Sequence, residues 1–129
     1  LAFESGDYFP FKKRFLDDIR TGRKTQTIRV WKVRHMRAGQ LSYIPGVGYI
    51  RVDSVDEVAL DDLTDEDAIP DGFLSVQELR AEIERLYSCD QLCAHRVFRI
   101  RFHVLPSDEQ RKIREQRRAR REGTRRQDQ

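Results

Sequence analysis

A lysine and several threonines follow a glycine turn near the start of the chain, in the stretch RTGRKTQTIRVWK. Lys24 and Thr27 lie three residues apart in it. A lysine amine is a useful base only when burial or neighbouring cations lower its pKa, and Arg20, Arg23 and Arg29 would supply such a field. The neutral amine could then take the hydroxyl proton of the threonine and make it a nucleophile. An ordinary polar strand face would use the same residues, so the spacing alone leaves both interpretations open.

A second cationic stretch, RVWKVRHMR, covers residues 29–37 and includes Trp31 and His35. Aromatic stacking combined with phosphate contacts is how proteins hold single strands and flipped bases. The stretch therefore indicates a nucleic-acid contact, and a solvated loop is the alternative. Its cations are Arg29, Lys32, Arg34 and Arg37.

The acidic residues 61–71 match no calcium-loop pattern and suit a solvated helix start. Asp71 stands apart in a turn before a helix, where it would either face a basic pocket or only form the turn. Cys89, Cys93 and His95 give one ligand fewer than a zinc site needs. The sequence thus predicts no metal and no cofactor, and it predicts the two cysteines as small apolar filler after a helix.

The elements that would position these groups follow from hydrophobic periodicity. Apolar residues at spacing four predict a first helix, and Ser75 with Glu78 forms a capping-box pattern at the start of a second. Period-two alternation predicts the strands, with a bulge or a bend where the phase slips between Val52 and Val55. The predicted helices cover residues 8–22 and 75–87 with a short turn after Thr64, and the predicted strands cover residues 24–30, 40–44, 49–60 and 96–105.

Composition bounds the rest. The 129 residues fit one domain, and no apolar run approaches the roughly 20 residues that span a membrane. Two cysteines suggest reduced thiols in a cytoplasmic protein. Nine basic and five acidic residues fall within 107–129, so the basic excess belongs to this tail, helical or disordered, and not to a domain at 1–106. The expected class is α+β, with a mostly antiparallel curved sheet or barrel.

Four stretches in order, FKKRFLDDIRTGRKTQTIR, RAGQL, LDDLTDEDAIPDGFLSVQELRAEIERLY and VFRIRFHVL, together resemble an ASCH domain of the PUA-like superfamily. The resemblance covers residues 8–105, and its most specific element is G-R-K-T-x-T-I-R. It implies a small curved β-barrel with two main helices, a cleft lined by that turn, and RNA as a partner. Contact of the tail with nucleic acid would be non-specific.

One bacterial branch of these domains hydrolyses the N4-acetyl amide of N4-acetylcytidine. The resemblance to it implies that Thr27 attacks the carbonyl and that Lys24 is the base. Asp71 would orient the lysine or hold the cytosine amine, although the branch has glutamate there. Arg29 or the backbone N–H groups of residues 22–24 would stabilise the oxyanion. The alternatives are a non-catalytic RNA-binding module, a single-strand ribonuclease and an interaction scaffold. The expected substrate-binding residues are Arg23, Thr25, Arg29, Trp31, Lys32, Arg34 and Tyr49.

Overall fold

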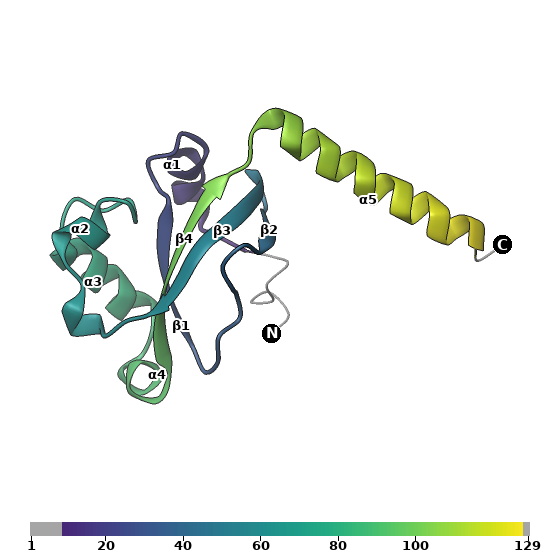
Figure 1. Ribbon diagram of the computed structural model, residues 1–129. Helices are drawn as coiled ribbons and strands as arrows, with labels where there is room; N and C mark the ends of the chain where they lie inside the picture. Colours follow the sequence, from purple (N-terminus) through teal and green to yellow (C-terminus); the bar gives the residue numbers. More distant parts are fainter. Residues whose placement is uncertain (1–8, 128–129) are drawn as a thin grey trace.

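A four-stranded antiparallel sheet forms the centre of the computed structural model, which describes residues 9–127 (Figure 1). The strand order is β1-β4-β3-β2, and among the described strands β1 and β2 are the edges, so the sheet is open. The predicted α+β class and antiparallel sheet are confirmed, whereas a closed PUA-like barrel stays a prediction. The strands are β1 (Gln26–Trp31), β2 (Leu41–Ile44), β3 (Gly48–Glu57) and β4 (Arg96–Val104).

Alternation along β4 explains how the sheet separates two apolar clusters. Phe98, Ile100 and Phe102 are buried on one face, and Val97 joins the cluster on the other. The register of β3 against β4 shifts between Val52 and Ser54, which confirms an irregularity where the phase slip predicted a bulge or a bend.

Two 3-10 segments and five α-helices connect and flank the strands of residues 9–127. The first predicted helix is shorter than expected, because Lys12 is extended and helical geometry starts only at Lys13. Pro10 explains part of this difference, since a proline disfavours helical geometry in the residue before it, and Phe9 donates to the carbonyl of Tyr43 instead. The segments are η2 (Lys13–Phe15), α1 (Leu16–Arg20), η3 (Leu60–Asp62), α2 (Asp65–Ala68), α3 (Val76–Leu86), α4 (Cys89–Ala94) and α5 (Ser107–Gln127).

The capping signals were predicted more accurately than the first helix. Thr64 and Asp67 form a capping box on α2, and the Ser75 hydroxyl accepts from the backbone N–H of Glu78 at the start of α3. The helix α4 was not predicted. It carries both cysteines at exposed positions, so their interpretation as buried filler was wrong.

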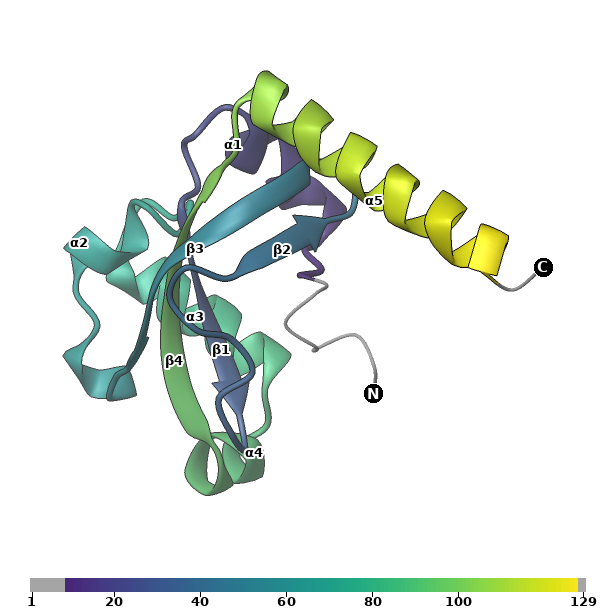
Figure 2. The ribbon, with the colours of Figure 1, turned by 45° about the vertical axis from the view of Figure 1, so that its right-hand side comes forward.

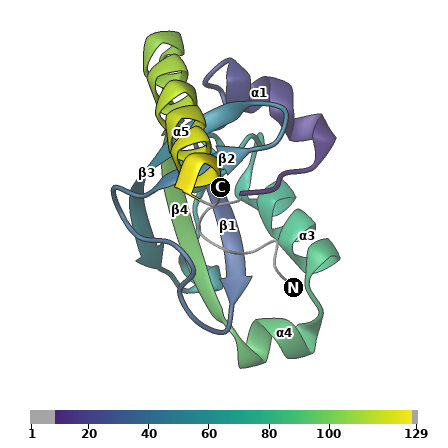
Figure 3. The ribbon, with the colours of Figure 1, turned by 90° about the vertical axis from the view of Figure 1, so that its right-hand side faces the viewer.

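The α3 helix packs on one face of the sheet, and α5 leaves the opposite side of the molecule and extends away from it (Figures 1 and 2). Leu79 and Ile83 of α3 are buried in one cluster with Ile28 and Val30 of β1. Figure 3 shows α3 beside β1, the edge strand against which it packs. Among residues 9–127 no helix is both long enough and apolar enough to cross a membrane.

Candidate functional site

A cleft of about 260 Å³ lies at the β1 edge, between α3 and the segment that precedes α1. Its walls are mainly apolar and aromatic, and its polar groups are few. Such a composition is typical of small-molecule sites, where a few polar groups fix the orientation of a ligand. The lining residues are Pro10, Phe11, Lys12, Phe15, Lys24, Ile28, Arg29, Asp71, Phe73, Leu79, Glu82, Ile83, Leu86 and Tyr87.

The turn between α1 and β1 places Lys24 at the floor of this cleft. Gly22 has φ of +79°, a conformation that glycine adopts without steric cost. The backbone N–H groups of Arg23 and Lys24 then both donate to the carbonyl of Asp18, at 2.9 Å each. The chain therefore leaves α1 in a fixed direction, with the lysine side chain turned inward and only 3% exposed.

A second tether brings Asp71 to the same place. The carbonyl of Pro70 accepts hydrogen bonds from the backbone N–H groups of Thr25 and Gln26, at 2.8 and 3.2 Å. The loop after α2 is thus held against the start of β1. Asp71 follows directly and is also 3% exposed.

Lys24 and Asp71 form a buried ion pair. The lysine Nζ lies 2.7 Å from the Asp71 Oδ1 and also donates to the Asp71 backbone carbonyl. The Gln26 amide donates to the other carboxylate oxygen at 3.4 Å. Three aromatic rings surround the amine, because Nζ lies 4.8 Å from the ring centroid of Phe15 and 5.8 Å from those of Phe11 and Phe73.

Burial controls the protonation of this pair. Removal from water lowers the pKa of Lys24, although Asp71 acts in the opposite direction. The same burial raises the pKa of Asp71, against the effect of Lys24 and the hydrogen bond from Gln26. Both shifts move the two groups towards their neutral forms. A neutral amine is the form that accepts a proton.

Thr27 lies in β1, three residues after Lys24, and is 6% exposed. Its hydroxyl accepts from Arg29 Nε at 3.4 Å, and within residues 9–127 no hydrogen bond joins it to Lys24. Arg29 lines the cleft, donates to the carbonyl of Pro10 at 2.7 Å, and stands 4.7 Å from the ring centroids of Phe9 and Phe11. The structure therefore brings Lys24 together with Asp71 and Thr27 together with Arg29, as two adjacent pairs.

The backbone of residues 22–24 cannot stabilise an oxyanion, contrary to the prediction. Its three N–H groups already donate within the turn, from Gly22 to the carbonyl of Ile19 and from the next two residues to that of Asp18. Arg29 remains as the cationic group in the cleft that could meet a developing negative charge.

The other residues expected to bind substrate are spread over the molecule. Trp31 is 5% exposed and packs on Phe98 in the core, so its ring faces no cleft. Tyr49 is 8% exposed and lies under α5. The remaining positions lie outside the cleft as well: Arg23 and Lys32 are exposed, Thr25 is half-buried, and Arg34 donates to the carbonyl of Val55.

The sequence did not predict the contacts at the rim of the cleft, where salt bridges join α3 to the segment before α1. Glu82 accepts from Arg14 and from Arg85, and Lys12 Nζ lies 3.7 Å from it. The hydrogen bonds from Arg85 and Arg14 lower the pKa of Glu82 to about 2. Glu82 occupies a polar position on a helix whose apolar face was predicted, and no spacing in the sequence singles it out as a bridging residue.

Comparison with known proteins identifies the fold. An ASCH domain from Lactobacillus crispatus JV V101 is similar, with a TM-score of 0.62 and 17% identity over 76% of this chain and 77% of that chain. The hypothetical protein PH0355 gives 0.62 and 16%, over 74% and 95%, and protein EF3133 from Enterococcus faecalis V583 gives 0.55 and 18%, over 81% and 76%. No family model and no curated protein matches the sequence. The chain therefore has the ASCH-domain fold, and at this identity the likeness concerns the fold alone.

Proposed function

We propose that the cleft binds a modified nucleoside, free or within RNA, and hydrolyses the N4-acetyl amide of N4-acetylcytidine. The observation that supports this proposal most directly is the Lys24–Asp71 pair, buried among three phenylalanine rings at the floor of a cleft of about 260 Å³. Aromatic walls suit a flat base, since every base has a face on which a ring can pack.

In this proposal Lys24 is the base and Thr27 the nucleophile. The threonine hydroxyl adds to the acetyl carbonyl carbon, and its proton passes to the lysine amine, which returns it to the departing N4 amine. Water then hydrolyses the acetyl ester and regenerates the hydroxyl. The Thr27 hydroxyl accepts a hydrogen bond from Arg29, which lines the cleft, so in this scheme the nucleophile must exchange that contact for one with Lys24.

Asp71 and Arg29 have supporting roles in the same scheme. The Asp71 carboxylate fixes the position of the lysine amine at 2.7 Å and keeps its protonated form accessible for the return of the proton. Arg29 lies beside Thr27 and would stabilise the charge that develops on the carbonyl oxygen.

Incubation of the protein with N4-acetylcytidine, followed by quantification of cytidine and acetate, tests the proposal. Lys24→Met keeps the volume of the side chain and removes the base, and we expect turnover to fall by about 10²-fold or more. Lys13→Met, at an exposed lysine that does not line the cleft, is the matched control and should retain turnover. The proposal fails if the wild-type protein releases no cytidine or if Lys24→Met is as active as the wild type.

A second function, nucleoside or RNA binding without turnover, is favoured by one observation. The Lys24 amine contacts two acceptors of Asp71, and Thr27 contacts Arg29, so among the described residues no hydrogen bond joins the proposed base to the proposed nucleophile. Titration with cytidine and N4-acetylcytidine distinguishes the two functions. Binding that Lys24→Met weakens, with no release of acetate by the wild type, would assign the cleft to recognition alone.

A further inference from the structure

We infer that α5 is a docking surface for the phosphate backbone of nucleic acid, and that one face of the helix, lined by Arg114, Arg117, Arg118 and Arg121, makes the contact. This surface is named the arginine face below. It lies outside the cleft and does not depend on the chemistry proposed for Lys24.

The first turn of α5 is fixed to the sheet, so the helix has a defined direction. The Gln110 side chain is 7% exposed; it accepts from the backbone N–H of Tyr49 at 2.9 Å and donates to the carbonyls of Tyr49 and Leu105 at 3.1 Å each. A Cβ at Gly48 would stand 2.5 Å from the Gln110 amide oxygen. Glycine at this position therefore permits the approach that orients the helix.

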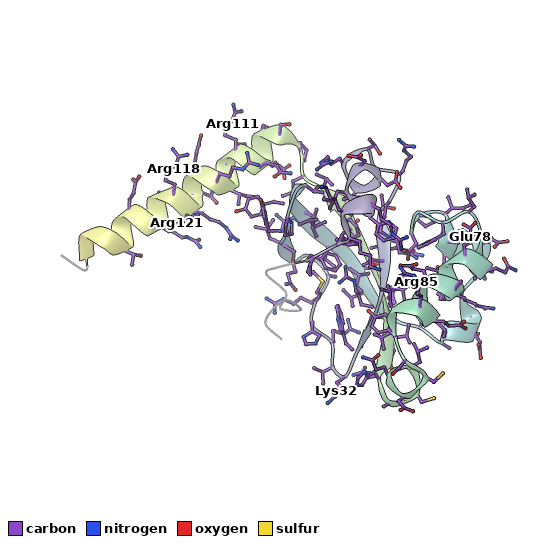
Figure 4. All side chains as sticks on the ribbon, turned by 180° about the vertical axis from the view of Figure 1, so that it is seen from behind. Lys32, Glu78, Arg85, Arg111, Arg118 and Arg121 are labelled. Atoms are coloured by element: carbon purple, nitrogen blue, oxygen red, sulfur yellow. The ribbon has the colours of Figure 1, made fainter. Side chains whose placement is uncertain are left out.

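Charge along the helix is dense and unpaired. Between Arg111 and Arg121 there are seven basic residues and one acidic residue, a net charge of +6 over eleven positions. No ion pair within the described residues involves any of the seven. Figure 4 shows the labelled side chains of Arg111, Arg118 and Arg121 projecting from the helix, with Arg118 and Arg121 farther from the sheet than Arg111.

The charges are also sorted around the helix. Asp108, Glu115 and Glu122 recur every seven residues and so lie along one line of the helix surface. Arg114 and Arg121 lie along another line, about 100° away. Arg114, Arg118 and Arg121 line a recess of about 370 Å³ with Tyr49, with Glu122 at its side, and the Arg117 guanidinium stands 5.1 Å from the Tyr49 ring centroid.

This pattern fits a regular polyanion better than other partners. From Arg111 to Arg121 the apolar residues are Ile113 and Ala119 alone, so the helix has no face for a coiled-coil partner or for insertion into a membrane surface. Six of the seven cations are arginines, whose planar fork bonds phosphate in a bidentate manner. The arginine face, from Arg114 to Arg121, extends over about 10 Å of helix axis, so it can contact several phosphates of a ligand that carries one phosphate per nucleotide.

The test compares two charge-matched double variants of the full chain. Arg114→Gln/Arg121→Gln removes two charges from the arginine face, and Lys112→Gln/Arg120→Gln removes two from other sides of the helix. Glutamine has nearly the helix propensity of arginine and lysine, and circular dichroism verifies that α5 persists. Binding of a labelled single-stranded RNA and of a labelled duplex DNA, each of mixed sequence, is measured by fluorescence anisotropy over a range of salt concentrations.

We expect salt-dependent binding by the wild type and a loss of about tenfold in affinity for Arg114→Gln/Arg121→Gln. The slope of log K against log salt should fall by about 1.4 for the single strand, because two phosphate contacts are lost. The control variant should lose less than half as much. Polyglutamate, an anionic polymer without phosphate, is the control ligand. Equal losses in the two variants, absent or salt-independent binding, or an affinity for polyglutamate equal to that for the nucleic acids would overturn the proposal. The relative affinity of the two nucleic acids decides which form docks.

Discussion

At the level of single residues, Lys24 and Asp71 form a buried ion pair within the cleft. Breaking a buried ion pair leaves one charge without compensation, which costs about 3–5 kcal/mol. Burial shifts the pKa values of the two members in opposite directions. Removal of each member should therefore change the pH dependence of the free energy of unfolding in a different way. These signatures are independent of any substrate.

Asp71→Asn leaves Lys24 buried without its counter-ion, and the pKa of the lysine in the folded protein should fall further below its usual value of about 10.4. Between these two values the unfolded chain binds more protons than the folded one, so the free energy of unfolding rises with pH. We expect the variant to be about 3–5 kcal/mol less stable than the wild type at neutral pH, and the deficit to shrink towards pH 10. Urea denaturation at several pH values measures this change.

Lys24→Met leaves Asp71 buried without a cation and should give the opposite slope. The pKa of the carboxyl in the folded protein, already raised by burial, should rise further above its usual value of about 3.9. Between those two values the folded protein binds more protons, so the free energy of unfolding falls as pH increases. Asp17→Asn, in an exposed pair with Arg20, is the control and should follow the wild-type profile. Parallel profiles for the two buried-site variants would contradict the assignment of the pair.

Residue types and spacing predicted part of this site. The resemblance singled out Lys24, Thr27 and Asp71, and the structure places Lys24 against Asp71 although 47 residues separate them. The Thr27–Arg29 contact was not predicted, because strand alternation gives the face of a residue and not its rotamer. The aromatic cage depends on Phe73, which reaches the lysine only through the loop held by Pro70. Hydrogen bonds between residues that are distant in the chain produce no periodic pattern in the sequence.

At the level of elements, the salt bridge from Arg14 to Glu82 joins the segment before α1 to α3 across the rim of the cleft. Glu82→Gln should loosen this connection. We expect hydrogen exchange at the Phe15 amide, which donates to the carbonyl of Lys12, to accelerate by about two- to fivefold, as surface ion pairs contribute up to about 1 kcal/mol each. Glu84→Gln, on the same helix and with no ion pair among the described residues, should leave the exchange rate unchanged.

The low pKa of Glu82, about 2, gives this rim contact a defined pH range. Its stabilising effect is fully present above the usual glutamate value of about 4.3 and is lost as pH falls through about 2. In the wild type, the protection of the Phe15 amide against exchange should therefore stay constant from neutral pH down to about pH 4. A loss of protection near neutral pH would show that a group other than Glu82 stabilises the rim.

Elements with strong local signals were predicted well, and those fixed by distant contacts were not. The β3 bulge and the start of α3 follow from alternation and capping, which are local. The first helix was predicted too long because its apolar spacing is helical, while Phe9 is held by a hydrogen bond to Tyr43 in β2. The short α4 begins with a capping box of Ser88 and Gln91. This local signal is present in the sequence, but the segment was interpreted only through its two cysteines.

At the level of the whole molecule, one buried glutamine sets the direction of α5. Its charge comes from exposed side chains that form no ion pair among the described residues. Orientation and charge are therefore separable by mutation. A freely moving tail would bind a polyanion through charge alone, whereas a helix held at its first turn presents the arginine face at a lower entropic cost.

Gln110→Ala keeps every charge and removes the three hydrogen bonds that fix the helix. The buried N–H of Tyr49 then loses its acceptor, which should cost about 1–3 kcal/mol in the free energy of unfolding. We expect affinity for single-stranded RNA to fall by about threefold or more, because ordering α5 on binding now costs free energy. Gln116→Ala, exposed on the same helix, is the matched control for both thermal unfolding and anisotropy. Undiminished RNA affinity in Gln110→Ala would show that the charge of α5 acts without its orientation, and that the fixed first turn serves stability alone.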